Sequence, residues 1–142
     1  EDAYPKIKSF AVRLFFSSLV VYLFAYIVLE RYFIVIFGNG WIGAVAFIKY
    51  LLFVSFFSFI FSPLSNLFNY FEIQHLNLIW QLAWLVSNVA IFYFGSILGL
   101  SALQIVMLFS IKQSILYTLG ILGFMLIAKR ESKHATTKDL LA

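Results

Sequence analysis

The residue of this chain with the clearest chemical potential is a lysine inside a long apolar segment. Lys112 lies within the apolar residues 102–128, close to Ser110, Gln113 and Ser114. An ammonium group deep in a membrane span costs about 2.5 to 3.5 kcal/mol on insertion scales, so something must compensate it. Two interpretations stand: a partner on helices outside this chain, or an anionic phosphate on a bound molecule. The charge indicates a function without specifying its ligand.

Neutral polar side chains recur at helical spacing in two other apolar segments. They advance by three or four residues, which aligns them as one stripe per helix: Ser55, Ser58, Ser62 and Ser65, then Asn77, Gln81, Trp84 and Asn88. Hydrogen bonding and close packing between helices is the simpler interpretation. The functional interpretation is a water-filled cavity in which hydroxyl and amide groups bind sugar. Its candidate lining residues are Ser55, Ser58, Ser62, Gln81, Asn88, Lys112 and Gln113.

Groups that catalyse hydrolysis or group transfer are scarce. The two histidines are His75 and His134, and the chain has no cysteine, which excludes disulfides and thiolate metal sites. We therefore predict no catalytic residue, no metal site and no cofactor. The sequence has no phosphate-binding glycine loop and no interleaving of basic and aromatic residues, so we expect no nucleic-acid partner.

The composition indicates which solvent surrounds these residues. The 142-residue chain is 63% hydrophobic and 20% aromatic but only 11% charged, and a small globule cannot hide that much apolar surface from water. Crossing a hydrocarbon core of about 30 Å takes about 20 helical residues. The sequence therefore predicts an all-α integral membrane domain over residues 14–128. Its four transmembrane helices are expected at residues 14–36, 41–64, 76–94 and 102–128.

Cations gather at the two ends of the chain. Residues 1–13 and 129–142 hold seven of the ten Lys and Arg residues. By the positive-inside rule, this predicts a cytoplasmic N-terminal flank and a cytoplasmic tail, both facing anionic lipid headgroups. The loop at 66–75 falls on the same side yet has no Lys or Arg, which weakens the prediction without reversing it. The first apolar run is too long for a signal peptide and lacks a small-x-small cleavage site, so we expect a membrane span there.

Two short motifs flank the second predicted helix. The first comprises Phe37, Gly38, Trp41 and Ala44, and the second comprises Ser62, Pro63, Leu64 and Ser65. Leu78, Ile79, Trp80 and Gln81 follow at the start of the third predicted helix. Over roughly residues 10–125 the chain resembles the C-terminal part of the polysaccharide and O-antigen flippases of the MATE-like superfamily. In that family a transmembrane helix ends in Phe-Gly-x-x-Trp-x-x-Ala, and the next helix runs down to Ser-Pro-Leu-Ser.

The resemblance implies a part of the second lobe of a MATE-like transporter in the bacterial inner membrane. Such a flippase moves polyprenyl-diphosphate-linked oligosaccharide units across the membrane by alternating access during O-antigen or capsule biosynthesis, without enzymatic activity. Because the chain opens at Glu1 without an initiator methionine, we expect the remaining helices of a longer transporter as partners. Two alternatives remain: a complete small four-span translocator of lipid-linked sugar, or a structural membrane subunit that transports nothing.

Proline and glycine residues predict where the helices bend or end. Pro63 removes a backbone donor, so the second span should kink or end near it and could serve as a hinge; a static exit from the membrane is the alternative. Gly95 and Gly99 have the spacing of a Gly-x-x-x-Gly packing motif, but their position favours a turn at residues 95–99.

Two charged residues near the outer ends of the first two spans are expected to be interfacial. Lys49 should extend its four-carbon stem to the lipid headgroups. Glu30 should pair with its sequence neighbour Arg31 at the membrane surface. Neither residue is expected to take part in transport.

Overall fold

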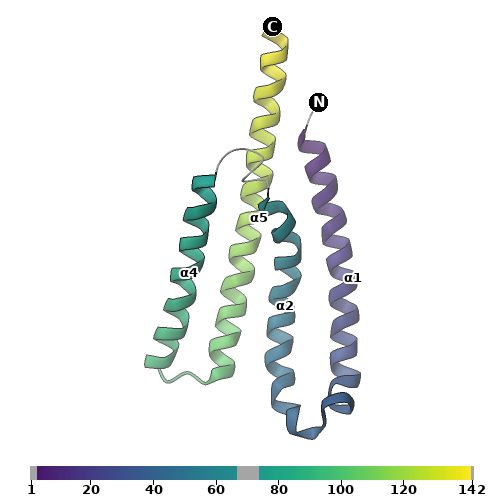
Figure 1. The fold of residues 1–142 in the computed structure, drawn as a ribbon, viewed down its shortest axis with the longest axis vertical. Coiled ribbons are helices and arrows are strands. Elements are labelled where there is room, and N and C mark those ends of the chain that lie inside the picture. Colours follow the sequence, from purple (N-terminus) through teal and green to yellow (C-terminus); the bar gives the residue numbers. More distant parts are fainter. Residues whose placement is uncertain (1–2, 67–73, 142) are drawn as a thin grey trace.

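A computed structural model describes residues 3–66 and 74–141 and places nearly all of them in helices (Figure 1). The helices are α1 (Ala3–Phe37), the 3-10 helix η1 (Asn39–Trp41), α2 (Ile42–Ser65), α4 (Gln74–Ile97) and α5 (Ala102–Leu141). Four stretches are long and apolar enough to cross a membrane: Tyr4–Phe37, Asn39–Ser65, Gln74–Ile97 and Ala102–Arg130. The predicted all-α fold with four helices of membrane-spanning length is therefore confirmed. Most of the predicted 66–75 loop lies outside the described residues.

A glycine makes the turn between α1 and α2. Gly38 has φ +84° and ψ 167°, a backbone conformation that is costly for any residue with a Cβ atom. Its N–H still donates to the carbonyl of Ile34 at 2.7 Å, and its carbonyl accepts from the N–H of Trp41 at 3.2 Å. The glycine of the Phe-Gly-x-x-Trp motif thus ends one helix and lets η1 begin the next.

The second tight turn joins α4 to α5 through standard capping. Gly99 has φ +67°, and the N–H of Leu100 donates to the carbonyl of Gly95 while that of Gly99 donates to Ser96, which is a Schellman motif. Ser101 and Gln104 then form a reciprocal capping box at the start of α5, with hydrogen bonds of 2.8 Å and 3.3 Å. The chain therefore reverses in four residues, and the two caps provide hydrogen-bond partners for backbone groups at both helix ends.

The four long helices run alternately up and down, so both chain ends lie at the same end of the bundle (Figure 1). Helix α2 packs against α1 and α5, and α4 packs against α5. Because α2 and α5 both start at the end with the two tight turns, these neighbours are parallel to each other. The same end of the bundle holds the end of α2 at Ser65 and the start of α4 at Gln74 (Figure 1).

The best-packed part of the bundle lies in the half nearest the chain ends. Ile60, Phe61, Leu64 and Phe124 are buried together there. The ring of Phe61 lies 5.4 Å from that of Trp80, 5.1 Å from that of Tyr117 and 5.7 Å from that of Phe124, measured between centroids. Phe61 thus connects α2 to both α4 and α5.

The outward faces of all four helices are apolar. Val35 of α1 is 80% exposed, Phe59 of α2 47%, Val86 of α4 65% and Leu126 of α5 68%. Leaving such side chains in water would cost about 1.5 to 3 kcal/mol each, whereas lipid tails accept them. Four apolar helices with these faces indicate a multi-pass membrane protein.

Three helices differ from the prediction. Helix α1 begins at Ala3, eleven residues before the expected start of the first span at residue 14. Helix α5 continues to Leu141, well beyond the expected end of the fourth span at residue 128, because Lys, Arg and Glu are good helix formers in water as well. Gly95 lies inside α4 rather than in a turn, and a Cβ atom there would approach Ile105 to 2.9 Å. The turn interpretation holds for Gly99 and is wrong for Gly95, which lets α4 and α5 approach closely.

Candidate functional site

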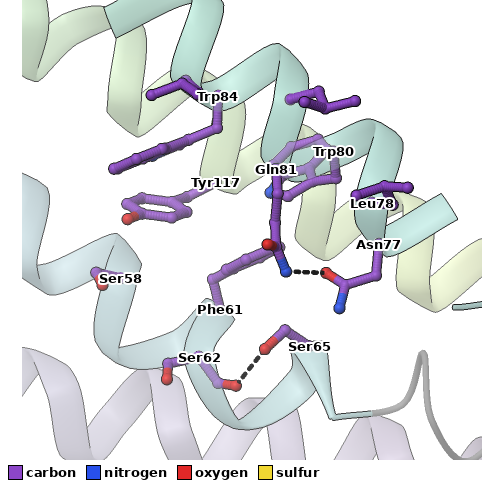
Figure 2. Close-up of a pocket in the computed structure, with 12 residues that line it drawn as sticks. Ser58, Phe61, Ser62, Ser65, Asn77, Leu78, Trp80, Gln81, Trp84 and Tyr117 are labelled. Atoms are coloured by element: carbon purple, nitrogen blue, oxygen red, sulfur yellow. Dashed lines mark hydrogen bonds between the residues drawn. The ribbon is translucent and has the colours of Figure 1, made fainter. Parts of the chain in front are cut away.

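A groove of about 590 Å³ lies between α2 and α4, with Tyr117 of α5 contributing to its lining (Figure 2). The two polar stripes of the sequence meet across it. Helix α2 contributes Ser58, Ser62 and Ser65, and α4 contributes Asn77 and Gln81. Helices α2 and α4 both pack against α5. Their contacts with α5 therefore set the distance between α2 and α4.

The polar groups of the groove are only partly occupied by one another. The side-chain amide of Gln81 donates to Oδ1 of Asn77 at 3.2 Å, and the hydroxyl of Ser65 donates to the carbonyl of Ser62 at 2.7 Å. A primary amide has two donors and an acceptor with two lone pairs, so Asn77 and Gln81 retain hydrogen-bonding capacity. The groove can therefore bind a ligand that both donates and accepts.

Aromatic rings form the apolar part of the groove. They come from all three helices: Phe61, Trp80, Trp84 and Tyr117. Gly120 on α5 makes room for them, because a Cβ atom there would lie 2.4 Å from the ring of Phe61 and 3.2 Å from that of Trp80. Broad aromatic faces beside amides and hydroxyls are an arrangement that suits sugar rings, whose faces are apolar and whose edges are hydroxylated.

Lys112 lies farther along the α4–α5 interface, outside this groove. Its ammonium donates to Oγ of Ser87 at 3.3 Å, to Oε1 of Gln113 at 2.9 Å and to Oδ1 of Asn88. It also lies 5.2 Å from the centroid of the Phe109 ring. An ammonium has three N–H donors, and these three oxygens match them. The sequence analysis expects groups outside the chain to compensate the charge of Lys112. In the structure, neutral side chains of the same chain do so.

The inner face of α5 near Lys112 is unusually polar for a packed interior. Gln113 and Ser110 are each 1% exposed, and Ser114 is 6% exposed. The hydroxyl of Ser114 donates to the carbonyl of Ser110 at 2.8 Å. Nε2 of Gln113 and Oγ of Ser110 are buried with no hydrogen-bond partner among the described residues. Because Lys112 requires the amide oxygen, it orients the amide of Gln113 so that the nitrogen points away.

The structure separates the predicted site residues into three groups. Ser58, Ser62 and Gln81 line the groove, and Asn88, Lys112 and Gln113 form the neighbouring hydrogen-bonded cluster. Ser55 lies elsewhere, in a hollow between α1 and α2 beside Ser18 and Tyr22. Its hydroxyl donates to the carbonyl of Leu51 at 2.9 Å, so this serine satisfies its own helix. Ser55 is seven residues from Ser62, so it lies about 10 Å farther along α2, toward the tight turn at Gly38.

Pro63 lies in the last turn of α2, which ends two residues later at Ser65. Its missing N–H removes the hydrogen bond that Phe59 would otherwise accept. The position agrees with the expectation that the second helix ends near the proline. Movement of α2 about this residue stays a prediction.

Lys49 and Glu30 pair with each other, which the sequence interpretation missed. Nζ of Lys49 lies 2.5 Å from Oε1 of Glu30, and the hydroxyl of Tyr26 donates to the same oxygen at 3.1 Å. This connects α1 to α2 near the tight turn. The short hairpin between the two helices was a signal for it, because residues about equally distant from the turn on antiparallel helices face each other.

The aromatic part of the groove was also missed. Trp80 is explained by the family-like motif and by an aromatic belt at the membrane surface, and Trp84 belongs to a polar stripe. Nothing in the sequence singles out Tyr117, because aromatic residues are common in membrane helices and carry no periodic signal of their own. Comparisons with protein-family models, curated proteins and solved structures find no match for this chain. The resemblance to flippases therefore rests on the motifs at residues 37–44, 62–65 and 78–81.

The lining of the groove supplies hydrogen-bonding groups and aromatic surface. It holds hydroxyls, amides and aromatic rings but no acid, base or strong nucleophile among the described residues. In the same part of the chain, no group of three His, Cys, Asp or Glu residues could hold a metal ion. General acid–base catalysis needs titratable groups within reach of the reacting atoms, and this lining supplies none.

Proposed function

We propose that this chain forms part of a flippase that moves polyprenyl-diphosphate-linked oligosaccharide units across the bacterial inner membrane for polysaccharide biosynthesis. The groove between α2 and α4 would contact the sugar while the lipid tail stays in the bilayer. The observation that carries the proposal is the meeting of two polar stripes and four aromatic rings in one groove, between helices long and apolar enough to span a membrane.

Two of the three flippase-like motifs border this groove. Ser62 and Ser65 of the Ser-Pro-Leu-Ser motif, and Trp80 and Gln81 of the following motif, belong to its lining. Under the proposal, the four helices belong to the second lobe of a MATE-like transporter, and both chain ends face the cytoplasm. Alternating access would then widen or narrow the groove by moving α4 relative to α2, with Pro63 as the hinge of the α2 end.

Photo-crosslinking tests the proposal directly. The probe is a polyprenyl-diphosphate disaccharide with a diazirine on the terminal sugar, added to the full chain in lipid nanodiscs, and labelled peptides are mapped by mass spectrometry. We expect labels on groove residues of α2 and α4, and reduced labelling after Gln81→Leu. Labels spread evenly over the outward faces of all helices, or no labels, would contradict a sugar-binding groove.

A matched variant separates loss of the site from general damage. Ser55→Ala removes a hydroxyl from the same helix as Ser58, but outside the groove and already bonded to its own backbone. It should leave labelling unchanged, whereas Ser58→Ala together with Ser62→Ala should lower it. Equal effects of the two changes would show that labelling does not depend on the groove serines.

A further inference from the structure

The groove between α2 and α4 is electrically neutral in the part of the chain that the structure describes. None of its lining residues is Asp, Glu, Lys, Arg or His. The sequence of residues 67–73, which follows α2, contains Glu72 and no Lys or Arg, so it holds no cation either. A ligand with a negative charge on its sugar would therefore meet no opposite charge in this lining.

Lys112 on α5 lies outside the groove, and its partner Asn88 lies one turn beyond Trp84 on α4. Its three donors are matched by the oxygens of Ser87, Asn88 and Gln113. To bind a carboxylate in the groove, it would have to leave at least one of them. The ammonium is thus occupied at the α4–α5 interface, and Lys112 is not among the residues that line the groove.

A carboxylate needs such attraction because it loses its hydration on entering a membrane-embedded groove. Burying an ionised carboxyl without a paired charge is far more costly than burying a hydroxyl that finds a hydrogen-bond partner. The serines, Asn77 and Gln81 provide partners for hydroxyl and N-acetyl groups, which donate and accept in the same way.

We propose that the groove selects uncharged sugars, hexoses and N-acetylhexosamines, and rejects sugars that carry a carboxylate. This selection rests on the proposed function, since it assigns the substrate class of the same groove. Within a lipid-linked oligosaccharide, the sugar units that contact α2 and α4 are then neutral ones, and a uronic or sialic acid unit must lie outside the groove.

Alkyl glycosides of matched shape test the selection. Octyl glucoside and octyl glucuronide differ only at C6, where a hydroxymethyl group replaces a carboxylate, and the methyl ester of the glucuronide restores neutrality. Each is titrated below its micelle concentration into the full chain in lipid nanodiscs.

Two readouts measure binding. In the variant Trp41→Phe, fluorescence reports only Trp80 and Trp84, both in the groove. Saturation-transfer NMR of the unchanged chain ranks the same ligands without any substitution.

We expect the glucoside and the methyl ester to bind alike, and the glucuronide to bind at least about tenfold more weakly, which corresponds to about 1.4 kcal/mol. Equal affinities for glucoside and glucuronide would overturn the charge selection and leave sugar binding intact. Absence of binding by all three would overturn the proposed function itself.

A glucuronide that binds more tightly than the glucoside would also overturn the selection. Lys112→Met then identifies the source: if this variant abolishes the preference, the ammonium leaves its cluster to bind anions. If the proposal holds, Lys112→Met leaves the ranking of the three ligands unchanged, because the ammonium contributes nothing to it.

Discussion

At the scale of single residues, Lys112 shows how a membrane charge can be held without a counter-ion. The sequence has no Asp or Glu between Glu72 and Glu131, and the ammonium instead donates to three neutral oxygens. Hydrogen bonds to charged groups contribute about 1.5 to 3 kcal/mol each, enough together to offset an insertion cost of about 2.5 to 3.5 kcal/mol. The lysine thereby acts as a polar tether between α4 and α5.

Two substitutions in this cluster should differ in their effects. Lys112→Met removes the hydrogen bonds of the ammonium and also its insertion cost, and these two changes oppose each other. We therefore expect the free energy of unfolding in detergent to change by less than about 1 kcal/mol. Asn88→Leu keeps the charge and removes an acceptor, so we expect a loss of about 1 to 3 kcal/mol. Thermal unfolding followed by circular dichroism measures both. Greater damage from Lys112→Met than from Asn88→Leu would show that the charge itself stabilises the fold.

The pair between Lys49 and Glu30 gives a second prediction at this scale. Lys49→Met leaves the carboxylate of Glu30 with the hydroxyl of Tyr26 but without its cation. We therefore expect the melting temperature of Lys49→Met to fall below that of the double variant Lys49→Met, Glu30→Gln. Melting curves at low and high salt provide the measurement, and a difference that disappears at high salt identifies it as electrostatic. Identical curves for the single and double variants would show that the pair contributes nothing.

At the scale of the helices, a glycine permits the contact that closes one end of the groove. Gly120→Ala would place a methyl group 2.4 Å from the ring of Phe61, so the rings of Phe61 and Trp80 must shift. Overpacking of this kind costs about 1 to 3 kcal/mol. Gly123 lies on the same helix with nothing within 4 Å of the added methyl, so Gly123→Ala should be neutral or stabilising by up to about 1 kcal/mol.

Paired measurement of these two variants provides the check. Unfolding in detergent should separate them, and Trp fluorescence should shift only in Gly120→Ala, where Trp80 moves. A stable Gly120→Ala with native fluorescence would mean that the aromatic rings adapt without strain.

The helices themselves followed from the sequence because hydrophobicity and length suffice to identify a span. The turns near Gly38 and Gly99 were also predictable, since glycine is the residue that tolerates their backbone angles. The site was predictable only in part: Ser58, Ser62 and Gln81 share one groove, but Ser55 does not. Residue spacings of three and four define a helix face only to within about 60°. Packing sets the rotation of each helix about its axis, and the sequence gives no sign that Phe61 packs against Gly120.

At the scale of the whole molecule, the up-and-down order of the helices sets the topology. The chain has no native cysteine, so single cysteines can be introduced without background. With an impermeant maleimide, we expect Asn39→Cys and Leu98→Cys, in the two tight turns, to react in intact spheroplasts. Ser9→Cys and Ser132→Cys should react only after permeabilisation, because the cationic ends favour the cytoplasm. Labelling of Ser9→Cys and Ser132→Cys from opposite sides would contradict four crossings.

The position of the groove determines how a ligand can reach it. Its lining comes from α2, α4 and α5, and none of the lining residues belongs to α1, so in this four-helix bundle it faces outward between two helices rather than along the bundle axis. A molecule anchored in lipid would arrive by lateral diffusion, in two dimensions. Occupancy would then follow the mole fraction of that molecule in the membrane, and diluting it with extra phospholipid should empty the site at constant bulk concentration.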